Sequence, residues 1–308
     1  MTNLKKTLLF LLCCQIYCFA NLLNAADTKY PIVLIHGLYG FSDRILCFAR
    51  YFGDIPELLT NHGATVYVAK VSQIHTFSER GEQLHQQLLR LGYDKYNLIG
   101  HSLGGLDARY VLENYPHMVA SVTTIGTPHR GSKIADYLER FTSNHTHLGP
   151  LSLFAGNLLG YLIGTLCGEL HWQDAYQSLH SLTTLALARY NRDHPTGVIN
   201  ADHEGGSSRY KGIRLYSWGS YGVENHKRCD LFRKILISKT IRVFDEGEIN
   251  DGIVSLDSMK FGKWLGAYEQ GHHLVPVGGI VSSISDMQSD WSRDMFLKHA
   301  YRLKRKGL

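Results

Sequence analysis

One serine in this 308-residue sequence lies in a pattern that can make it a nucleophile. Ser102 is the centre of Gly-His-Ser-Leu-Gly at residues 100–104, which follows a short apolar run and precedes a helix-compatible segment. Strand, sharp turn and helix in this order are typical of a nucleophile elbow. The flanking glycines lack the Cβ atoms that would crowd the turn, and the start of a helix favours negative charge nearby. The alternative, a chance match in a loop, does not account for the strand and helix on either side.

Two later residues could complete a catalytic triad with this serine. Asp251 lies in Asn-Asp-Gly, a turn sequence that places a carboxylate at the end of an element, and His273 lies in Gly-His-His-Leu. The order Ser102, Asp251, His273 is the chain order of an α/β-hydrolase triad. The sequence contains 17 histidines, and the adjacent His272 remains an alternative base.

The residues that would stabilise an oxyanion come from a loop near the start of the chain. The apolar run Tyr30–Ile35 leads into His-Gly-Leu at residues 36–38. Glycine after a strand lets backbone N–H groups approach a ligand, so this loop could supply half of an oxyanion hole. Carboxyl ends of parallel strands meet at one edge of a sheet, which would bring this loop to Ser102.

The elements that must position these residues alternate between strand and helix patterns. Continuous apolar runs predict strands buried on both faces, and amphipathic stretches predict the helices between them. This rhythm indicates an α/β fold with a mainly parallel central sheet and helices on both faces. The expected strands are 30–35, 64–71, 96–101, 120–126 and 211–218, and the expected helices are 45–62, 78–91, 179–191 and 230–239.

The first 26 residues predict a secretory signal peptide. Lys5 and Lys6 precede an uncharged apolar run from Thr7 to Ala20, and small residues follow at Asn24–Ala26. A membrane anchor is the alternative, but the run is shorter than the roughly 20 residues that a spanning helix needs. We therefore expect secretion to the periplasm or the exterior, and a single catalytic domain over residues 27–308.

Charge and cysteine content restrict the class of protein further. Removal of residues 1–26 lowers the formal net charge from +5 to +3, which is too small and too scattered to indicate nucleic-acid binding. Three cysteines remain, Cys47, Cys167 and Cys229. They permit one disulfide in an oxidising compartment, and the sequence does not decide which pair forms it.

An uncharged segment interrupts the strand–helix rhythm. Leu148–Gly168 has glycine at every fourth position from Gly156 to Gly168. It is long enough for a transmembrane helix with a glycine packing face, and it could also be a buried core helix. The favoured interpretation is an apolar lid within an insertion at about residues 133–190, because the insertion follows a strand end near the expected site.

Several stretches together resemble the secreted bacterial triacylglycerol lipases of the Pseudomonas and Burkholderia type, which have the α/β-hydrolase fold. The most specific are Thr-Pro-His-Arg-Gly-Ser at residues 127–132 and the Asn-Asp-Gly turn. This resemblance implies a triad of Ser102, Asp251 and His273, with the backbone N–H groups of Leu38 and Leu103 as the oxyanion hole. It also implies a lid in the insertion and, for many relatives, a dedicated foldase partner. The similar stretches are 31–41, 100–105, 123–138, 215–220 and 250–262.

The sequence departs from that family at three places. Relatives bind a structural calcium through an aspartate two residues after the catalytic histidine, and Val275 stands there. We therefore expect a calcium site to be weak or absent. Asp202 and Asp257 stand where some relatives have disulfide-bonded cysteines, so that bridge is not expected. His272 replaces the Asp or Asn that usually precedes the histidine.

We therefore expect a secreted serine lipase that hydrolyses the esters of acylglycerols through an acyl-enzyme. The chemistry requires no metal or other cofactor. Another serine esterase, such as a phospholipase or a polyester depolymerase, would keep the triad and change the pocket. A catalytically silent surface protein on the same scaffold is the alternative of another class, and the complete set of triad candidates argues against it.

Overall fold

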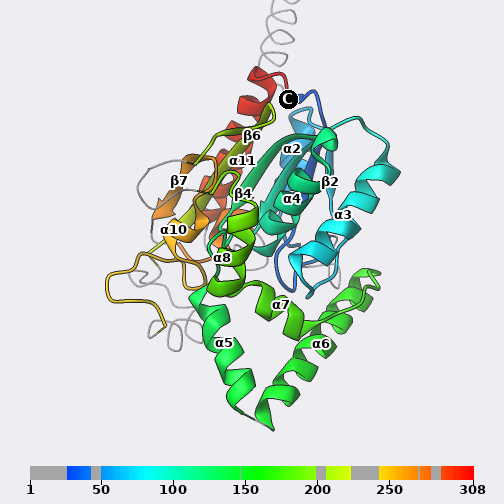
Figure 1. Ribbon diagram of the computed structural model, residues 1–308. Coiled ribbons are helices and arrows are strands. Elements are labelled where there is room, and N and C mark those ends of the chain that lie inside the picture. The colour runs from blue at the N-terminus through cyan, green and yellow to red at the C-terminus, as the bar shows by residue number, and fades with distance from the viewer. Residues whose placement is uncertain are drawn as a thin grey trace, which may run out of the picture.

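A computed structural model describes residues 26–42, 50–145, 147–198, 206–222, 243–269, 271–278 and 286–308. In these residues a seven-stranded sheet forms the centre of the molecule, with β7 paired to β6 beside the strand order β2-β1-β3-β4-β6-β5 (Figure 1). The pairs are parallel except for β5 with β6, which confirms the mainly parallel sheet. The strands are β1 Ile32–Ile35, β2 Val66–Val68, β3 Tyr96–His101, β4 Val119–Ile125, β5 Arg209–Tyr210, β6 Ile213–Tyr221 and β7 Lys263–Glu269.

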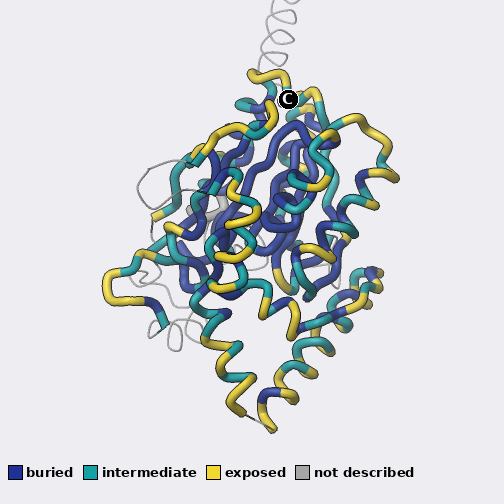
Figure 2. The backbone as a smooth tube through the Cα atoms, viewed as in Figure 1, coloured by how far each residue is buried: buried dark blue, intermediate teal, exposed yellow. Residues whose placement is uncertain are grey.

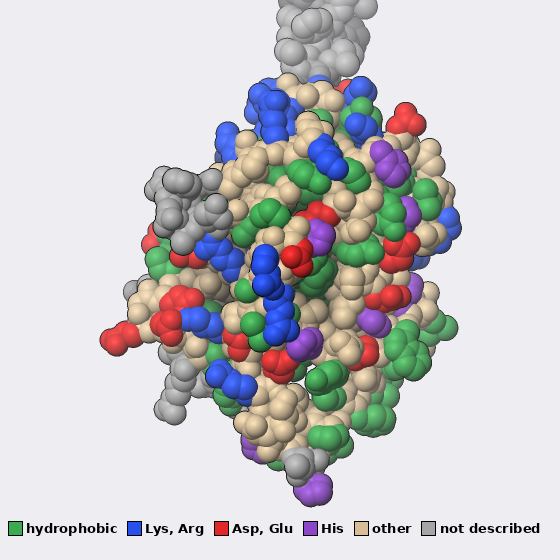
Figure 3. Space-filling model, viewed as in Figure 1, with side chains coloured by type: hydrophobic (Ala, Val, Ile, Leu, Met, Phe, Trp, Pro, Cys, Tyr) green, Lys and Arg blue, Asp and Glu red, His purple; other side chains and the backbone are tan. Residues whose placement is uncertain are grey.

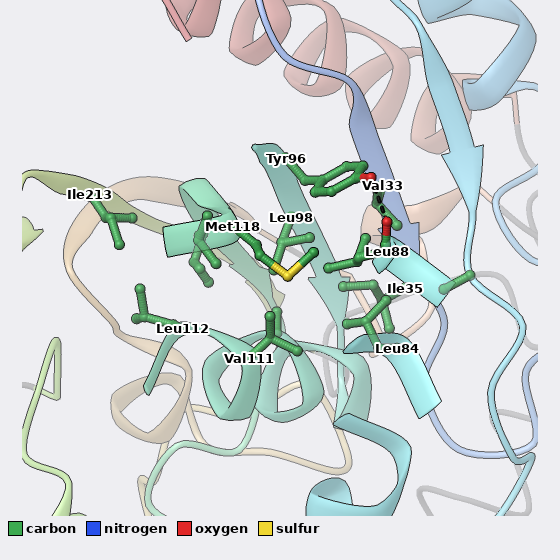
Figure 4. Packing of buried hydrophobic residues seen from close by; sticks show 14 of the residues in the cluster. Val33, Ile35, Leu84, Leu88, Tyr96, Leu98, Val111, Leu112, Met118 and Ile213 are labelled. Carbon is green, nitrogen blue, oxygen red and sulfur yellow. Dashed lines mark hydrogen bonds between the residues drawn. The ribbon is translucent and has the colours of Figure 1, made fainter. Parts of the chain in front are cut away.

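Helices cover both faces of this sheet, so the central strands β1, β3, β4 and β6 are buried, while β2, β5 and β7 are partly exposed (Figure 2). Side chains alternate along each strand, and in β1 Val33 points into the core beneath α3 and α4, while Leu34 points into the core beneath α2 and α11. Figure 4 shows the first core close by, with Leu84 of α3 and Val111 of α4 against Leu98 of β3. The helices concerned are α2 Ile55–Asn61, α3 Phe77–Leu91, α4 Leu103–Asn114 and α11 Asp286–Arg305.

Local chemistry accounts for the ends of α3. The hydroxyl of Thr76 accepts the N–H of Glu79 and caps the first turn, and Gly92 ends the helix in the left-handed conformation. The prediction of a helix over 78–91 was therefore accurate. The prediction of one helix over 179–191 was wrong. The stretch is divided between α7, Ala175–Ser181, and α8, Thr184–Asp193, and the hydroxyl of Thr183 caps α8 by accepting the N–H of Ala186.

Other boundaries also differ from the predictions. The expected strand over 64–71 is shorter, and within the expected helix over 45–62 the structure describes α2 while residues 43–49 lie outside the described part. The expected helix over 230–239 also lies outside the described residues, as do the segment 1–25, Cys47, Asp202 and Cys229. Short helical segments complete the described fold: η1 Pro116–Met118, α10 Leu256–Met259 and η3 Val275–Val277.

The chain between β4 and β5 forms a separate helical layer that stands away from the sheet. Helix α5, Lys133–Asn144, and helix α6, Leu148–Cys167, form a V at one end of the molecule, followed by α7 and α8 (Figure 1). By length and apolar composition α6 could cross a membrane, and only 11% of its apolar stretch is buried in the protein. The alternative of a buried core helix is therefore wrong: α6 lies on the surface, with Leu151 and Phe154 more than 60% exposed.

The buried side of α6 is its glycine face. Gly160 and Gly164 are buried, and a Cβ on Gly160 would lie 3.0 Å from Cγ2 of Ile74. A Cβ on Gly164 would lie 2.3 Å from the carbonyl oxygen of Glu169. The absence of side chains at these positions thus lets the backbone of α6 lie directly on the body of the molecule.

Candidate active site

Ser102 lies at a strained turn between β3 and α4. Its φ of 54° and ψ of −125° lie in a region that residues other than glycine rarely occupy. A Cβ on Gly100 would lie 2.2 Å from the carbonyl oxygen of Gly104, so a side chain there would prevent the turn. The N–H of Ser102 donates to the carbonyl of Ile125 at the end of β4 (2.8 Å), which anchors the turn to the sheet.

Asp251 is held by the turn that the sequence predicted. The side-chain oxygen of Asn250 accepts the N–H of Gly252 (2.9 Å). The Asp251 side chain is fully buried, and one of its carboxylate oxygens accepts the N–H groups of Ile253 (3.0 Å) and Val254 (2.8 Å). These two hydrogen bonds fix the orientation of the carboxylate. Its other oxygen points to His273.

The structure brings Ser102, Asp251 and His273 together from distant parts of the sequence. Nδ1 of His273 lies 2.6 Å from Oδ2 of Asp251, and Nε2 lies 2.8 Å from Oγ of Ser102. Because a carboxylate only accepts, Nδ1 carries the proton and Nε2 accepts the serine hydroxyl. The N–H of His273 also donates to the backbone carbonyl of Asp251 (3.0 Å), which fixes the two loops to each other.

His272 has a different environment from its neighbour. Its backbone carbonyl accepts the hydroxyl of Ser220 (2.9 Å), and its Nδ1 accepts the N–H of Leu274 (3.3 Å). The hydroxyl of Ser102 is in contact with the ring of His273 instead. Between the two histidines that the sequence left as alternatives, the geometry favours His273 as the base.

The two residues predicted for the oxyanion hole lie on either side of Ser102. Leu103 is the first residue of α4, where backbone N–H groups have no acceptor within the helix. Gly37 lies so close to the nucleophile that a Cβ on it would be 2.8 Å from Cβ of Ser102, which brings the following residue, Leu38, to the same site. Among the described residues, no hydrogen-bond acceptor engages the N–H of Leu38 or of Leu103. Both remain available to a ligand.

Tyr51 and His101 support this arrangement, and the sequence analysis missed both. The Tyr51 hydroxyl accepts the N–H of Gly37 (2.9 Å) and donates to Nδ1 of His101 (2.5 Å). Nε2 of His101 then donates to the backbone carbonyl of His273 (2.9 Å). Burial holds the pKa of His101 well below its usual value, so the ring is neutral, as these hydrogen bonds require. His101 occupies a variable position of the serine motif, and Tyr51 lies about 50 residues away, so no local pattern marked them.

A second buried group holds the loop that contains Leu38. Arg80 is fully buried, and it donates to the backbone carbonyl of His36 (2.6 Å) and to the carboxylate of Asp107 in α4 (2.7 Å). Burial raises the pKa of Asp107 to about 6, against the opposing effect of the Arg80 charge. The arginine thus joins the end of β1 to the helix that follows Ser102.

An apolar cavity of about 340 Å³ opens beside Ser102. Its walls come from the Leu38 loop, from α5 and α7 of the helical layer, and from the loops that carry the other two triad candidates. Besides Ser102 and His273, the lining includes Leu38, Ile134, Leu138, Leu179, Leu182, Ile253, Leu274 and Val277. A cavity of this size and composition suits a hydrocarbon chain next to a reacting carbonyl group.

Val275 occupies the position where the family resemblance implies a calcium-ligating aspartate. Val275 is 3% exposed within η3, and its side chain offers no oxygen ligand. In the part of the chain that the structure describes, no three His, Cys, Asp or Glu side chains converge as a metal site would require. Weak dependence on calcium therefore stays a prediction.

Comparisons with known proteins show the family of this chain. Residues 30–148 match the model of the alpha/beta hydrolase fold. The chain is 38% identical to a triacylglycerol lipase of Vibrio cholerae over 92% of its own length and 90% of that protein. It is 33% identical to a triacylglycerol lipase of Pseudomonas fragi, over 92% of this chain and 99% of that protein.

Solved structures extend the likeness to the fold as a whole. The crystal structure of Staphylococcus hyicus lipase superposes with a TM-score of 0.62 at 17% identity, covering 92% of this chain and 98% of that one. EstA from Clostridium botulinum gives 0.57 at 17% identity, covering 92% and 88%. Identity this low supports only the shared fold. The higher identity to the two triacylglycerol lipases also supports the shared function. The chain therefore belongs to the triacylglycerol lipase family, whose α/β-hydrolase fold it shares, and it is an ester hydrolase.

Proposed function

We propose that Ser102 is the nucleophile, His273 the general base and Asp251 the residue that orients the base. His273 takes the hydroxyl proton as Ser102 attacks the ester carbonyl, and the carboxylate of Asp251 stabilises the imidazolium that forms. The alcohol leaves with the proton from His273, and an acyl-enzyme remains. Water, activated by the same histidine, then releases the fatty acid. These steps require no metal.

The N–H groups of Leu38 and Leu103 stabilise the oxyanion in both steps. Their freedom from other acceptors among the described residues supports this role. Donors that are fixed before the reaction lose little free energy in reorganising as charge develops on the carbonyl oxygen. Leu103 adds the positive end of the α4 dipole.

The single observation that carries the proposal is the position of the His273 ring. It contacts the hydroxyl of Ser102 on one side and the Asp251 carboxylate on the other, at the mouth of an apolar cavity. A nucleophile with a base and a place for a hydrocarbon chain is what hydrolysis of an acylglycerol ester requires.

The helical layer acts as the lid of this site. Large apolar side chains project from α6 into solvent and gather on the lower right of the molecule in Figure 3. Leaving such side chains in water costs about 1.5–3 kcal/mol for each fully exposed one, relative to burial. Contact with an oil surface removes much of that cost, so we expect the interface to favour the open lid.

Two further properties belong to the proposal. Residues 1–26 act as a secretory signal peptide, so the protein works outside the cytoplasm on a lipid or ester substrate at an oil–water or membrane interface. A lipase-specific foldase is the expected partner in folding.

The test compares wild type with Ser102→Ala on a short-chain triglyceride, across its solubility limit. Wild type should hydrolyse the dissolved ester slowly and accelerate when droplets form, and the variant should lose at least ~10³-fold at both stages. Variant activity above ~1% of wild type would exclude Ser102 as the nucleophile, since triad losses are far larger. A smooth saturation curve for wild type without acceleration would exclude the lid.

His273→Ala and His272→Ala form a matched pair for the base. His273→Ala should be as inactive as Ser102→Ala, because the serine then has no proton acceptor. His272→Ala should keep most of its activity, since its ring does not contact the nucleophile. The reverse ranking would assign the base to His272.

A further inference from the structure

The end of the lid helix is joined to the oxyanion loop, residues 36–42, by a buried carboxylate. Glu169 follows the last turn of α6 and is 3% exposed. It accepts the N–H of Ser42 (3.1 Å), the hydroxyl of Ser42, and Nε2 of Gln73 (3.1 Å). Among the described residues, this one side chain of the helical layer receives three donors from the body, and one of the donor residues, Ser42, ends the oxyanion loop.

Gln73 extends this connection in both directions. Its backbone carbonyl accepts the N–H of Tyr39, the residue after Leu38 (2.7 Å). Its side-chain oxygen accepts Nε2 of Gln173, which lies beyond Glu169 in the loop after α6 (2.8 Å). Gln173 in turn accepts the N–H of Ile74 (2.8 Å). The loop after α6 and the oxyanion loop are thus bonded to the same short segment.

The oxyanion loop needs such support because its backbone is strained. Tyr39 has a φ of 53°, in the left-handed region that a residue with a bulky side chain occupies only at a cost in free energy. Strain of this kind persists where surrounding contacts determine the conformation. Here the contacts after Leu38 come from Gln73 and Glu169, and the position of the Leu38 N–H depends on them.

We propose that Glu169 is a positioning residue for the oxyanion hole, and that it couples the seating of lid helix α6 to the placement of the Leu38 N–H. The proposal rests on the proposed function of Ser102 and Leu38. Glu169 lies away from the reacting atoms and acts through the loop that it holds. While the end of α6 at Glu169 stays on the body, the carboxylate holds Ser42 and the loop stays in place. The lid must therefore open about this end, with the contacts of Glu169 intact.

A carboxylate is the side chain that suits this position. It only accepts hydrogen bonds, and its two oxygens receive the three donors found among the described residues. Glutamine has the same shape but turns an NH₂ group toward one of those donors, so it keeps only part of the interaction. Alanine removes all of it.

The test uses a pair of soluble substrates that depend differently on the oxyanion hole. An oxoester develops charge on oxygen, which accepts the Leu38 hydrogen bond strongly, whereas the matched thionoester develops charge on sulfur, a weak acceptor. A misplaced Leu38 N–H should therefore slow the oxoester more than the thionoester. A purely structural defect should slow both equally.

We expect Glu169→Ala to lower kcat for the oxoester by on the order of 10-fold or more, with KM within about twofold of wild type, because the lost interaction acts in the transition state. The thionoester should lose less than about threefold, given the weak part that the hole has in its reaction. Glu169→Gln should lie between Glu169→Ala and wild type, and Ser42→Ala, which removes a partner from the other side, should shift the ratio of the two rates in the same direction.

Asn157→Ala is the matched control within the lid. The Asn157 side chain accepts the N–H of Ala175 and joins α6 to α7 without touching the oxyanion loop (2.7 Å). This variant should leave the ratio of oxoester to thionoester rates unchanged, even where it lowers thermal stability.

Two results would overturn the proposal: an unchanged kcat in Glu169→Ala, or equal losses for both substrates in all three variants. If Glu169→Ala does not fold, the isosteric Glu169→Gln and Ser42→Ala decide the outcome. Failure of the proposed function would give a different result, because ester hydrolysis would then be unaffected by Ser102→Ala. In that case the positioning role of Glu169 would also be excluded.

Discussion

At the scale of single residues, the site depends on buried polar groups that satisfy one another. Tyr51 is the clearest case, since its hydroxyl serves both the backbone of the oxyanion loop and His101. The ring itself packs among aromatic neighbours, including Phe41 and Phe52, so its shape and its hydroxyl make separate contributions. Those contributions can be separated by substitution.

Tyr51→Phe should lower both stability and activity. It leaves the Gly37 N–H and Nδ1 of His101 without their partner inside the protein, at a cost of about 1–3 kcal/mol for each buried group. Urea unfolding measures the stability, and kcat for a soluble ester measures the activity. Tyr93→Phe is the control: its hydroxyl pairs with Tyr67 at the exposed surface, so its stability should stay within about 0.5 kcal/mol of wild type. Equal effects of the two substitutions would contradict the role given to the Tyr51 hydroxyl.

At the scale of elements, α6 combines an apolar outer face with a glycine face that packs on the body. Glycine at every fourth position can either loosen a helix or let it pack closely against its neighbours. The nearest atoms of the body decide between them, because a Cβ on Gly164 would lie 2.8 Å from Oε1 of Gln73 and a Cβ on Gly160 would lie 3.0 Å from Cγ2 of Ile74. At Gly164 the added Cβ would also lie 2.3 Å from the backbone carbonyl oxygen just after the helix, which cannot move aside as a flexible side chain can. Close packing is the better description.

Gly164→Ala should therefore destabilise the seating of α6, although alanine is the better helix former by about 1 kcal/mol. Gly156→Ala is the comparison, since its Cβ would meet the hydroxyl end of Tyr39 at 2.9 Å and Cβ of Ala175 at 3.3 Å, and a side-chain end can shift. Thermal melting and the rate of limited proteolysis within α6 report the outcome. Stabilisation by Gly164→Ala would support the loosened helix instead.

At the scale of the whole molecule, buried neutral histidines set the response to acid. Burial lowers the pKa of His36 and of His299 to about 3, and holds the pKa values of His101 and His129 well below their usual range. In the unfolded chain each binds a proton near pH 6.5. Stability contributed by these groups is thus present above about pH 6.5 and is lost as the pH falls toward the folded-state values.

The expected result is a steep loss of stability in weak acid. Each histidine contributes a slope of up to about 1.4 kcal/mol per pH unit. Asp107 and Glu113, whose pKa values are raised by burial, favour the folded state as the pH falls and offset part of this loss. The total stability of a typical domain is only about 5–15 kcal/mol. Urea midpoints should be level between pH 8 and about 7 and fall sharply below about 6. A level curve down to about pH 4.5 would contradict this account.

The sequence by itself determined the parts of this protein that depend on neighbours in the chain. Continuous apolar runs required strands buried on both faces, and the glycines around Ser102 required a sharp turn. Asn-Asp-Gly required a turn that presents Asp251. Strand and helix order then implied the parallel sheet, and the chain order of the three candidates matched an α/β-hydrolase triad.

Only the tertiary structure decided what depends on distance through space. It placed the ring of His273, and not that of His272, against Ser102. The path of this loop is set by hydrogen bonds to distant parts of the chain, which the local sequence does not show. It divided 179–191 at Thr183, where a capping hydrogen bond outweighed the helical pattern. It also joined Tyr51 to His101 and Glu169 to Ser42, pairs separated by 50 and 127 residues. Such pairs leave no periodic signal in a sequence, since the chain between them can have any pattern and still bring their ends together.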